Sequence, residues 1–205
     1  MIDRTIARVG AASGIVYVLV IFASPGLFDG DTATRVELVG MLFLLPFLGY
    51  LWRVLREAEG AHGWLSMAAL ISGLSAVTIK IASAAPLLAA DKEAEGTRLH
   101  NALVNVNDAS FILTMLPLGV MAAAAATLTL NTGVLPRWLG WLSAATAPAL
   151  VVNGLFFHSQ EGPAFLLFAL WLLATSVVLT LRAGARPSHA TRTQPTSARA
   201  TGVGA

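Results

Sequence analysis

The chain has 205 residues, of which 56% are apolar and only 12% are Asp, Glu, Lys or Arg. That is about half the charged share of an ordinary soluble domain, and so few charges cannot cover the surface of a water-soluble fold of this size. The mean hydropathy of +0.73 agrees. These values exclude a soluble globular protein and indicate a membrane protein of one domain or at most two.

The absence of cysteine excludes disulfides, cysteine-based zinc sites, iron–sulfur clusters and thiol nucleophiles. The formal net charge is +2 and the isoelectric point is near 9.5. The basic residues lie beside the ends of apolar runs and in the C-terminal tail, where membrane topology accounts for them. We therefore expect the lipid bilayer as a partner and no nucleic acid; nothing in the sequence identifies a protein partner.

Apolar runs of about 20 residues recur along the chain, which is the length that crosses ~30 Å of hydrocarbon as a helix. They predict six spans, over residues 6–23, 36–55, 64–88, 99–130, 135–157 and 163–181. Because backbone amides in lipid must pair within their own segment, each span is expected to be helical. The fold class is therefore an all-α, six-span transmembrane helical bundle over residues 1–182. Residues 183–205, which are rich in Arg, Thr, Ser, Pro and Gly, are expected to form a disordered basic cytoplasmic tail.

The orientation follows from the cations, once the loops are assigned alternately to the two sides. One side receives Arg4, Arg8, Arg53, Arg56, Arg137, Arg182, Arg186, Arg192 and Arg199, and the other receives Arg35, Lys92 and Arg98. The positive-inside rule then places both termini in the cytoplasm, with the protein in the cell (plasma) membrane. The first span can also be interpreted as a secretory signal. A retained helix is favoured, because it gives an even number of spans with basic residues at both ends.

Two ionisable residues lie within the predicted spans. Lys80 lies eight residues before Leu88, about 12 Å below the outer end of its helix, and Asp108 lies ten residues after Arg98, about 15 Å into the next, antiparallel helix. Each charge would cost about 2.5 to 3.5 kcal/mol to insert alone. We therefore expect the two to face each other as an ion pair.

Further polar residues are expected at the same depth. Asn101, Asn105 and Asp108 follow i, i+4, i+7 spacing, which places them on one helical face. Asn153 and His158 approach the outer end of the fifth span, and Glu37 begins the second. Together they predict an outward-opening polar pocket among the second to fifth helices, with an inner half nearly bare of such groups. The alternative is that these residues only hold helices together, as buried polar pairs often do.

Sequence motifs of known chemistry are missing. There is no phosphate-binding loop, HExxH, GxSxG or dinucleotide fingerprint. The four histidines have no metal-ligand spacing. We expect no metal and no cofactor.

The strings Asn107-Asp108-Ala109-Ser110-Phe111, Leu116-Pro117-Leu118 and Leu135-Pro136-Arg137-Trp138-Leu139-Gly140-Trp141 resemble a family of bacterial six-helix integral membrane proteins of unknown function. The resemblance extends from about Ala7 to Leu181 and implies the six-span bundle, with the Asn-Asp element in a shared motif. The same element is similar to small integral-membrane cyclases of terpenoid pathways, which have seven spans and use intramembrane carboxylates as acids.

Three functions fit these features. In the first, an intramembrane enzyme converts a small lipophilic molecule by acid–base chemistry, as in cyclisation or isomerisation. Asp108 and Lys80 would be catalytic, and Glu37, Asn101, Asn105, Asn153 and His158 would bind substrate. The second is a small-solute or proton-coupled transporter that uses the same pair as a relay. The third is a non-catalytic membrane accessory protein.

Overall fold

The structure is a computed structural model that describes residues 2–28, 30–61, 63–157 and 162–184. Over these ranges it is helical, without strands. The helices are α1 (Ile2–Leu27), α2 (Gly30–Glu59), α3 (Leu65–Ala90), α4 (Arg98–Thr132), α5 (Arg137–Val152), the π-helical turn η1 (Asn153–Phe157) and α6 (Pro163–Gly184). Six helices are long and apolar enough to cross a membrane. The predicted six-helix bundle is confirmed, and the chain is a multi-pass membrane protein.

Several helices extend beyond the predicted spans, α2 by several residues at each end. Hydropathy marks only the part of a helix that lies in hydrocarbon. The helix itself can continue further, provided that the unpaired N–H and C=O groups at its ends find hydrogen-bond partners. At α4, the Thr97 side chain accepts from the His100 amide, and Gly133 ends the helix in the left-handed conformation at φ 68°. The 35 residues of α4 measure about 52 Å, which exceeds the ~30 Å hydrocarbon layer. α4 therefore reaches past the apolar layer.

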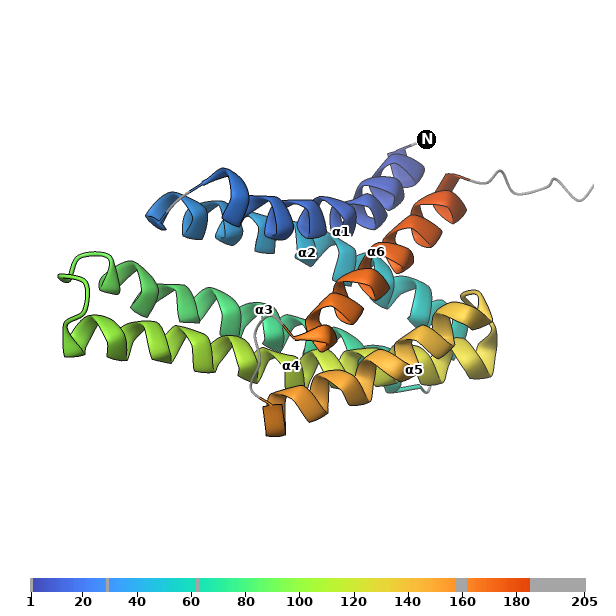
Figure 1. Cartoon of the computed structure of the whole chain (residues 1–205). Coiled ribbons are helices and arrows are strands. Elements are labelled where there is room, and N and C mark those ends of the chain that lie inside the picture. The colour runs from blue at the N-terminus through green and yellow to red at the C-terminus, as the bar shows by residue number, and fades with distance from the viewer. Residues whose placement is uncertain (1, 29, 62, 158–161, 185–205) are drawn as a thin grey trace, which may run out of the picture.

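The helices form two long hairpins crossed by α6. Figure 1 shows α1 and α2 together above α3 and α4, with α6 running obliquely between them; α6 packs on α1 and α5. We call the end that carries the α3–α4 loop, with Asp91, Glu93 and Glu95, the acidic end. We call the opposite end, where α2, α4 and α6 finish, the basic end. At the acidic end the two hairpins extend beyond the junction of α5 and α6 (Figure 1).

A close crossing of α1 with α6 and α2 fixes the basic half of the bundle. A Cβ atom on Gly14 would lie 2.2 Å from Ser176 Oγ and 2.8 Å from Phe47 Cδ2. Phe47 and Ser176 are both fully buried, so neither has space to move away. Glycine is therefore required at residue 14 for the backbones to approach this closely.

Buried hydroxyl groups line the same half of the bundle. They belong to Ser13, Ser66, Thr129, Ser143, Thr146, Thr175 and Ser176. Most bond to backbone carbonyls of their own helix, and Ser143 Oγ also accepts from Trp171 Nε1, which joins α5 to α6. These hydroxyls are of a different kind from the carboxylate, amide and imidazole groups that the sequence predicts to be scarce in this half, and serine and threonine can be buried because their hydroxyls can bond to the preceding helical turn.

The turn between α2 and α3 is held by two charged side chains of α2. Glu59 accepts from the backbone amides of Leu65 at 2.6 Å and Ser66 at 2.9 Å, which are otherwise unpaired at the start of α3. Arg56 donates to the carbonyls of Gly63 and Ala61. This charged clamp closes the helical connection at the basic end.

We predict that Gly14→Ala destabilises the fold by about 1 to 3 kcal/mol, because the new methyl group overpacks the α1–α6 crossing. Gly49→Ala is the matched control, since a Cβ at residue 49 meets nothing within 4 Å, and it should be neutral or stabilise by up to ~1 kcal/mol. Thermal unfolding in detergent measures both. Equal stability of the two variants would contradict the close crossing.

We predict that Glu59→Ala costs about 1 to 2 kcal/mol of stability, because two amides at the start of α3 lose their acceptor. Glu57→Ala serves as the control: Glu57 forms an exposed ion pair with Arg53 at 2.9 Å, and such pairs contribute ~1 kcal/mol or less. Denaturant unfolding compares the two. A larger loss for the Glu57 variant would show that the clamp has no role.

Candidate functional site

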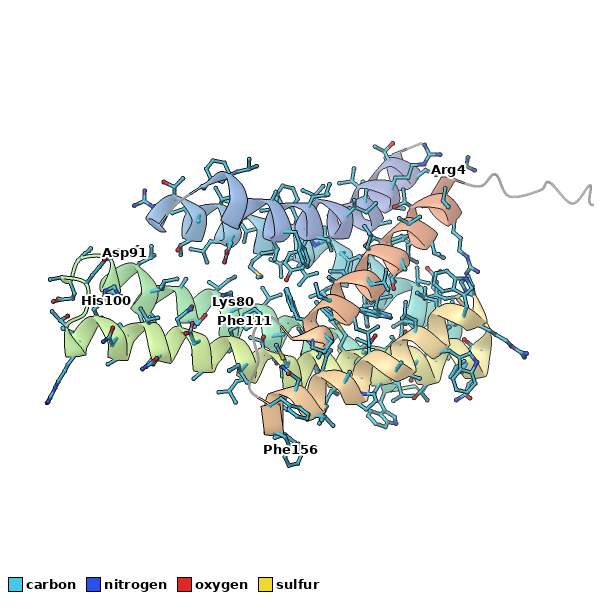
Figure 2. All side chains as sticks on the ribbon, in the orientation of Figure 1. Arg4, Lys80, Asp91, His100, Phe111 and Phe156 are labelled. Atoms are coloured by element: carbon cyan, nitrogen blue, oxygen red, sulfur yellow. The ribbon has the colours of Figure 1, made fainter. Side chains whose placement is uncertain are left out.

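Lys80 lies on α3, ten residues before its end at Ala90, which is about 15 Å along the helix. Its Nζ lies 4.9 Å from the centre of the Phe111 ring of α4, within the range of a cation–π interaction. Figure 2 shows Lys80 and Phe111 together inside the bundle, well away from Asp91 at the acidic end. The ammonium is therefore held between helices rather than in the loop.

Two carboxylates lie near this ammonium. Glu37 of α2 lines the same space as Lys80, and Asp108 of α4 is hydrogen-bonded to Asn107, which also lines it. Neither forms an ion pair with Lys80 within the described ranges. The expected direct Lys80–Asp108 pair is therefore wrong. The Lys80 side chain contacts the Phe111 ring and shares a space with Glu37, because α2 packs against α3.

Asn107 of α4 lies next to this charge. It is 8% exposed, and its Nδ2 donates to Asp108 Oδ1 at 3.2 Å. That bond fixes the orientation of the amide, so its Oδ1 points the other way. Asn107 Oδ1 is buried and has no hydrogen-bond partner. A buried acceptor without a donor costs about 1 to 3 kcal/mol, so its presence here calls for a reason.

Three spaces follow one another along the interface of α2 and α3. The widest, about 570 Å³, opens at the acidic end beside Arg35, Ala85, Leu88, Ala89, Asp91 and Lys92. The next, about 10 Å³, is lined by Thr34, Glu37, Leu38, Met41, Lys80, Ala84, Leu87 and Asn107. The deepest, about 20 Å³, is lined by Tyr17, Met41, Leu44, Ala76, Val77, Lys80, Phe111, Thr114, Leu118 and Phe165. The inner two are each about the size of one water molecule.

The site therefore gathers side chains from α1, α2, α3, α4 and α6, and none from α5. The predicted pocket among the second to fifth helices is wrong in this respect, because α6, which crosses the bundle obliquely (Figure 1), contributes Phe165 to the lining and α1 contributes Tyr17. Lys80 and Met41 border both inner spaces.

The other residues predicted for the site lie elsewhere. Asn101 and Asn105 are exposed on the part of α4 near the acidic end. Asn153 is buried in η1, where its Nδ2 donates to Met115 Sδ at 2.8 Å and joins α5 to α4. His158 lies outside the described residues. The structure thus brings Glu37, Lys80 and Asp108 together and separates them from Asn101, Asn105 and Asn153.

The face of α4 predicted from the sequence, with Asn101, Asn105 and Asp108, is rotated from the face that lines the site. The lining residues are Asn107, Phe111, Thr114 and Leu118, at i, i+4, i+7, i+11 spacing. That stripe is about 120° from the one through Asn101, Asn105 and Asp108, since the two are offset by six residues at about 100° per residue. The signal was present in the sequence: Asn107 begins a stripe that continues as an apolar core face, whereas Asn101 and Asn105 do not.

No group of three or more His, Asp or Glu side chains that could hold a metal occurs within the described ranges. The chemistry of the site is that of one amine, two carboxylates, an amide and a phenol. These groups can donate, accept and transfer protons.

Comparisons with protein families, with curated proteins and with solved structures found no match to this chain. The resemblance to bacterial six-helix membrane proteins therefore stays a prediction. The argument for function rests on the geometry of this site.

We predict that the space beside Lys80 is reached by water from the acidic end. The chain has no cysteine, so one introduced thiol can be followed alone. Ala84 lines that space, and the Ala84→Cys variant reports water access by its reaction with a small membrane-impermeant thiol reagent. Ala85→Cys, in the wide opening, should react faster. Ala69→Cys, buried in the core of the same helix, should not react. An Ala84→Cys thiol as inert as the one at residue 69 would refute the path.

Proposed function

We propose that this multi-pass membrane protein binds a small lipophilic molecule at Lys80 and exchanges a proton with it. The observation that carries the proposal is the position of the Lys80 ammonium: it lies inside a helical bundle, subject to two carboxylates, and is paired directly with neither. A structural ion pair would bring the charges into contact. An amine whose donors stay available is suited to a ligand.

The polar groups support acid–base chemistry. Lys80 and the carboxylates of Glu37 and Asp108 differ in charge and in environment, which is the arrangement that separates a proton donor from a proton acceptor. In this proposal Lys80 contacts the ligand, and Glu37 is the nearest group that can give or take a proton on the same side. Asp108 acts through Asn107, whose amide it holds in place.

The lipophilic character of the ligand follows from the walls of the deeper space. Phe111, Phe165, Val77 and Leu118 form an apolar floor beneath the Lys80 ammonium. Because the inner spaces hold about one water each, a larger ligand enters only when the two hairpins separate. They have no crossing helix between them at the acidic end (Figure 1), so we propose entry there, from the outer leaflet if the positive-inside rule holds.

A proton-coupled carrier would use the same residues but needs a second path to the basic end. In this conformation Phe47, Leu48 and Met121 are buried in a packed hydrophobic core, and none of the three spaces is lined by them. The geometry therefore favours a binding or converting site that is open to one side.

We predict that Lys80→Met and Asp108→Asn leave the protein folded but reduce, by about tenfold or more, any small molecule that co-purifies with it from native membranes. Loss of one hydrogen bond to a charged group, about 1.5 to 3 kcal/mol, gives this factor. Mass spectrometry of the extracts and thermal unfolding of the same samples measure both effects.

Glu93→Gln and Glu95→Gln are the controls, because both residues lie in the exposed α3–α4 loop and line none of the three spaces. They should retain the bound molecule. Unfolding of both site variants with intact controls would indicate that Lys80 and Asp108 only hold helices together. Folded variants with unchanged extracts would refute the proposed site.

A further inference from the structure

The orphaned acceptor of Asn107 indicates what kind of group the site recognises. Asn107 is more than nine-tenths buried, its Nδ2 is committed to Asp108, and its Oδ1 has no donor. It lines the same space as Lys80 and Glu37. A molecule that occupies this space must therefore donate a hydrogen bond to satisfy Asn107.

The Lys80 ammonium sets the complementary requirement. It carries three donors and can accept nothing. Its described contact is the face of Phe111, which leaves its N–H groups without an oxygen or nitrogen acceptor among the described residues. The same occupant must therefore accept a hydrogen bond from Lys80 while it donates to Asn107.

These two requirements exclude most polar groups. A carboxylate or phosphate dianion accepts from Lys80 but has no proton for Asn107, and it meets two carboxylates nearby. A quaternary or primary ammonium cannot accept from Lys80. A ketone or ester carbonyl accepts but cannot donate. A hydroxyl group does both through one oxygen atom, and a space of about 10 Å³ admits a polar group of about that size.

We infer that the polar group recognised here is a neutral hydroxyl, carried by a lipophilic alcohol, that donates to Asn107 Oδ1 and accepts from Lys80 Nζ. This inference rests on the proposed function and adds the chemical class of the ligand. The apolar body of the alcohol lies against Phe111, Phe165 and Leu118, which line the deeper space, once the hairpins have separated and widened it. Water has the same donor and acceptor pattern but gains nothing from that apolar floor, which is why the structure assigns an alcohol.

Three probes with the same chain and different head groups test this inference: 1-decanol, decanoate and decylammonium at neutral pH. Native mass spectrometry of the full-length protein in detergent measures the fraction of protein with one bound probe. We expect 1-decanol to bind about tenfold or more tightly than either charged probe, since each of those leaves one buried group unpaired.

Two asparagines of α4 provide a matched pair of variants. Asn107→Ala should weaken 1-decanol binding about tenfold, whereas Asn105→Ala, at an exposed position, should leave it unchanged. Lys80→Met should weaken it similarly. If Asn107→Ala lowers the thermal stability of the protein, the ranking of the three probes on the wild-type chain still tests whether the recognised group is a hydroxyl.

The outcomes separate this inference from the proposed function. Tighter binding of decanoate or decylammonium that is lost in Lys80→Met would overturn the hydroxyl assignment and leave a small-molecule site at Lys80. Binding of none of the probes to the wild-type chain would overturn the assignment and leave water as the O–H group beside Asn107. Equal binding of all probes to wild type and Lys80→Met would overturn both proposals.

Discussion

A charge in the interior of a membrane protein has to be solvated by the protein, and Lys80 imposes this constraint on the whole bundle. Its insertion alone costs about 2.5 to 3.5 kcal/mol. The Phe111 ring lies under the ammonium, and the carboxylates of Glu37 and Asp108 supply the opposite charge from two other helices. Each stabilising group comes from a neighbouring helix. The position of Lys80 therefore depends on how α2, α3 and α4 pack together.

The two halves of the bundle meet different demands. In the basic half, the close approach at Gly14, the buried hydroxyls and the Trp171–Ser143 hydrogen bond join α1, α5 and α6 without any ionisable side chain. The other half carries Lys80, Glu37 and Asp108 within the bundle, together with the small polar spaces. A well-packed region thus supports a less tightly packed one, which is the usual relation between a scaffold and a binding site.

The sequence predicted the six helices because about 20 apolar residues in a row leave the backbone no alternative in lipid. It also identified Lys80, Glu37 and Asp108, because charges within spans are rare enough to stand out. It missed Tyr17, Asn107 and Phe111, whose residue types are ordinary in a membrane helix. Their role depends on the rotation of α4 and on the oblique path of α6, and both are set by packing between segments far apart in the chain.

The difference between Asn105 and Asn107 illustrates this limit. Both are asparagines on one helix, yet Asn105 is exposed and Asn107 is buried beside Lys80. Spacing alone grouped Asn105 with Asp108 on one face. The stripe from Asn107 to Leu118 is visible in the sequence as a largely apolar face, but that it lines the site depends on which helices pack against that side of α4.

The most direct test of the account is an experimental density map of the protein in a lipid nanodisc, at a resolution that shows ordered water. The account predicts the Lys80 side chain between α2, α3 and α4, with density for a bound molecule within hydrogen-bond distance of both Lys80 Nζ and Asn107 Oδ1. A Lys80 side chain that points into lipid, or an Asn107 side chain that is turned away from it, would contradict the account.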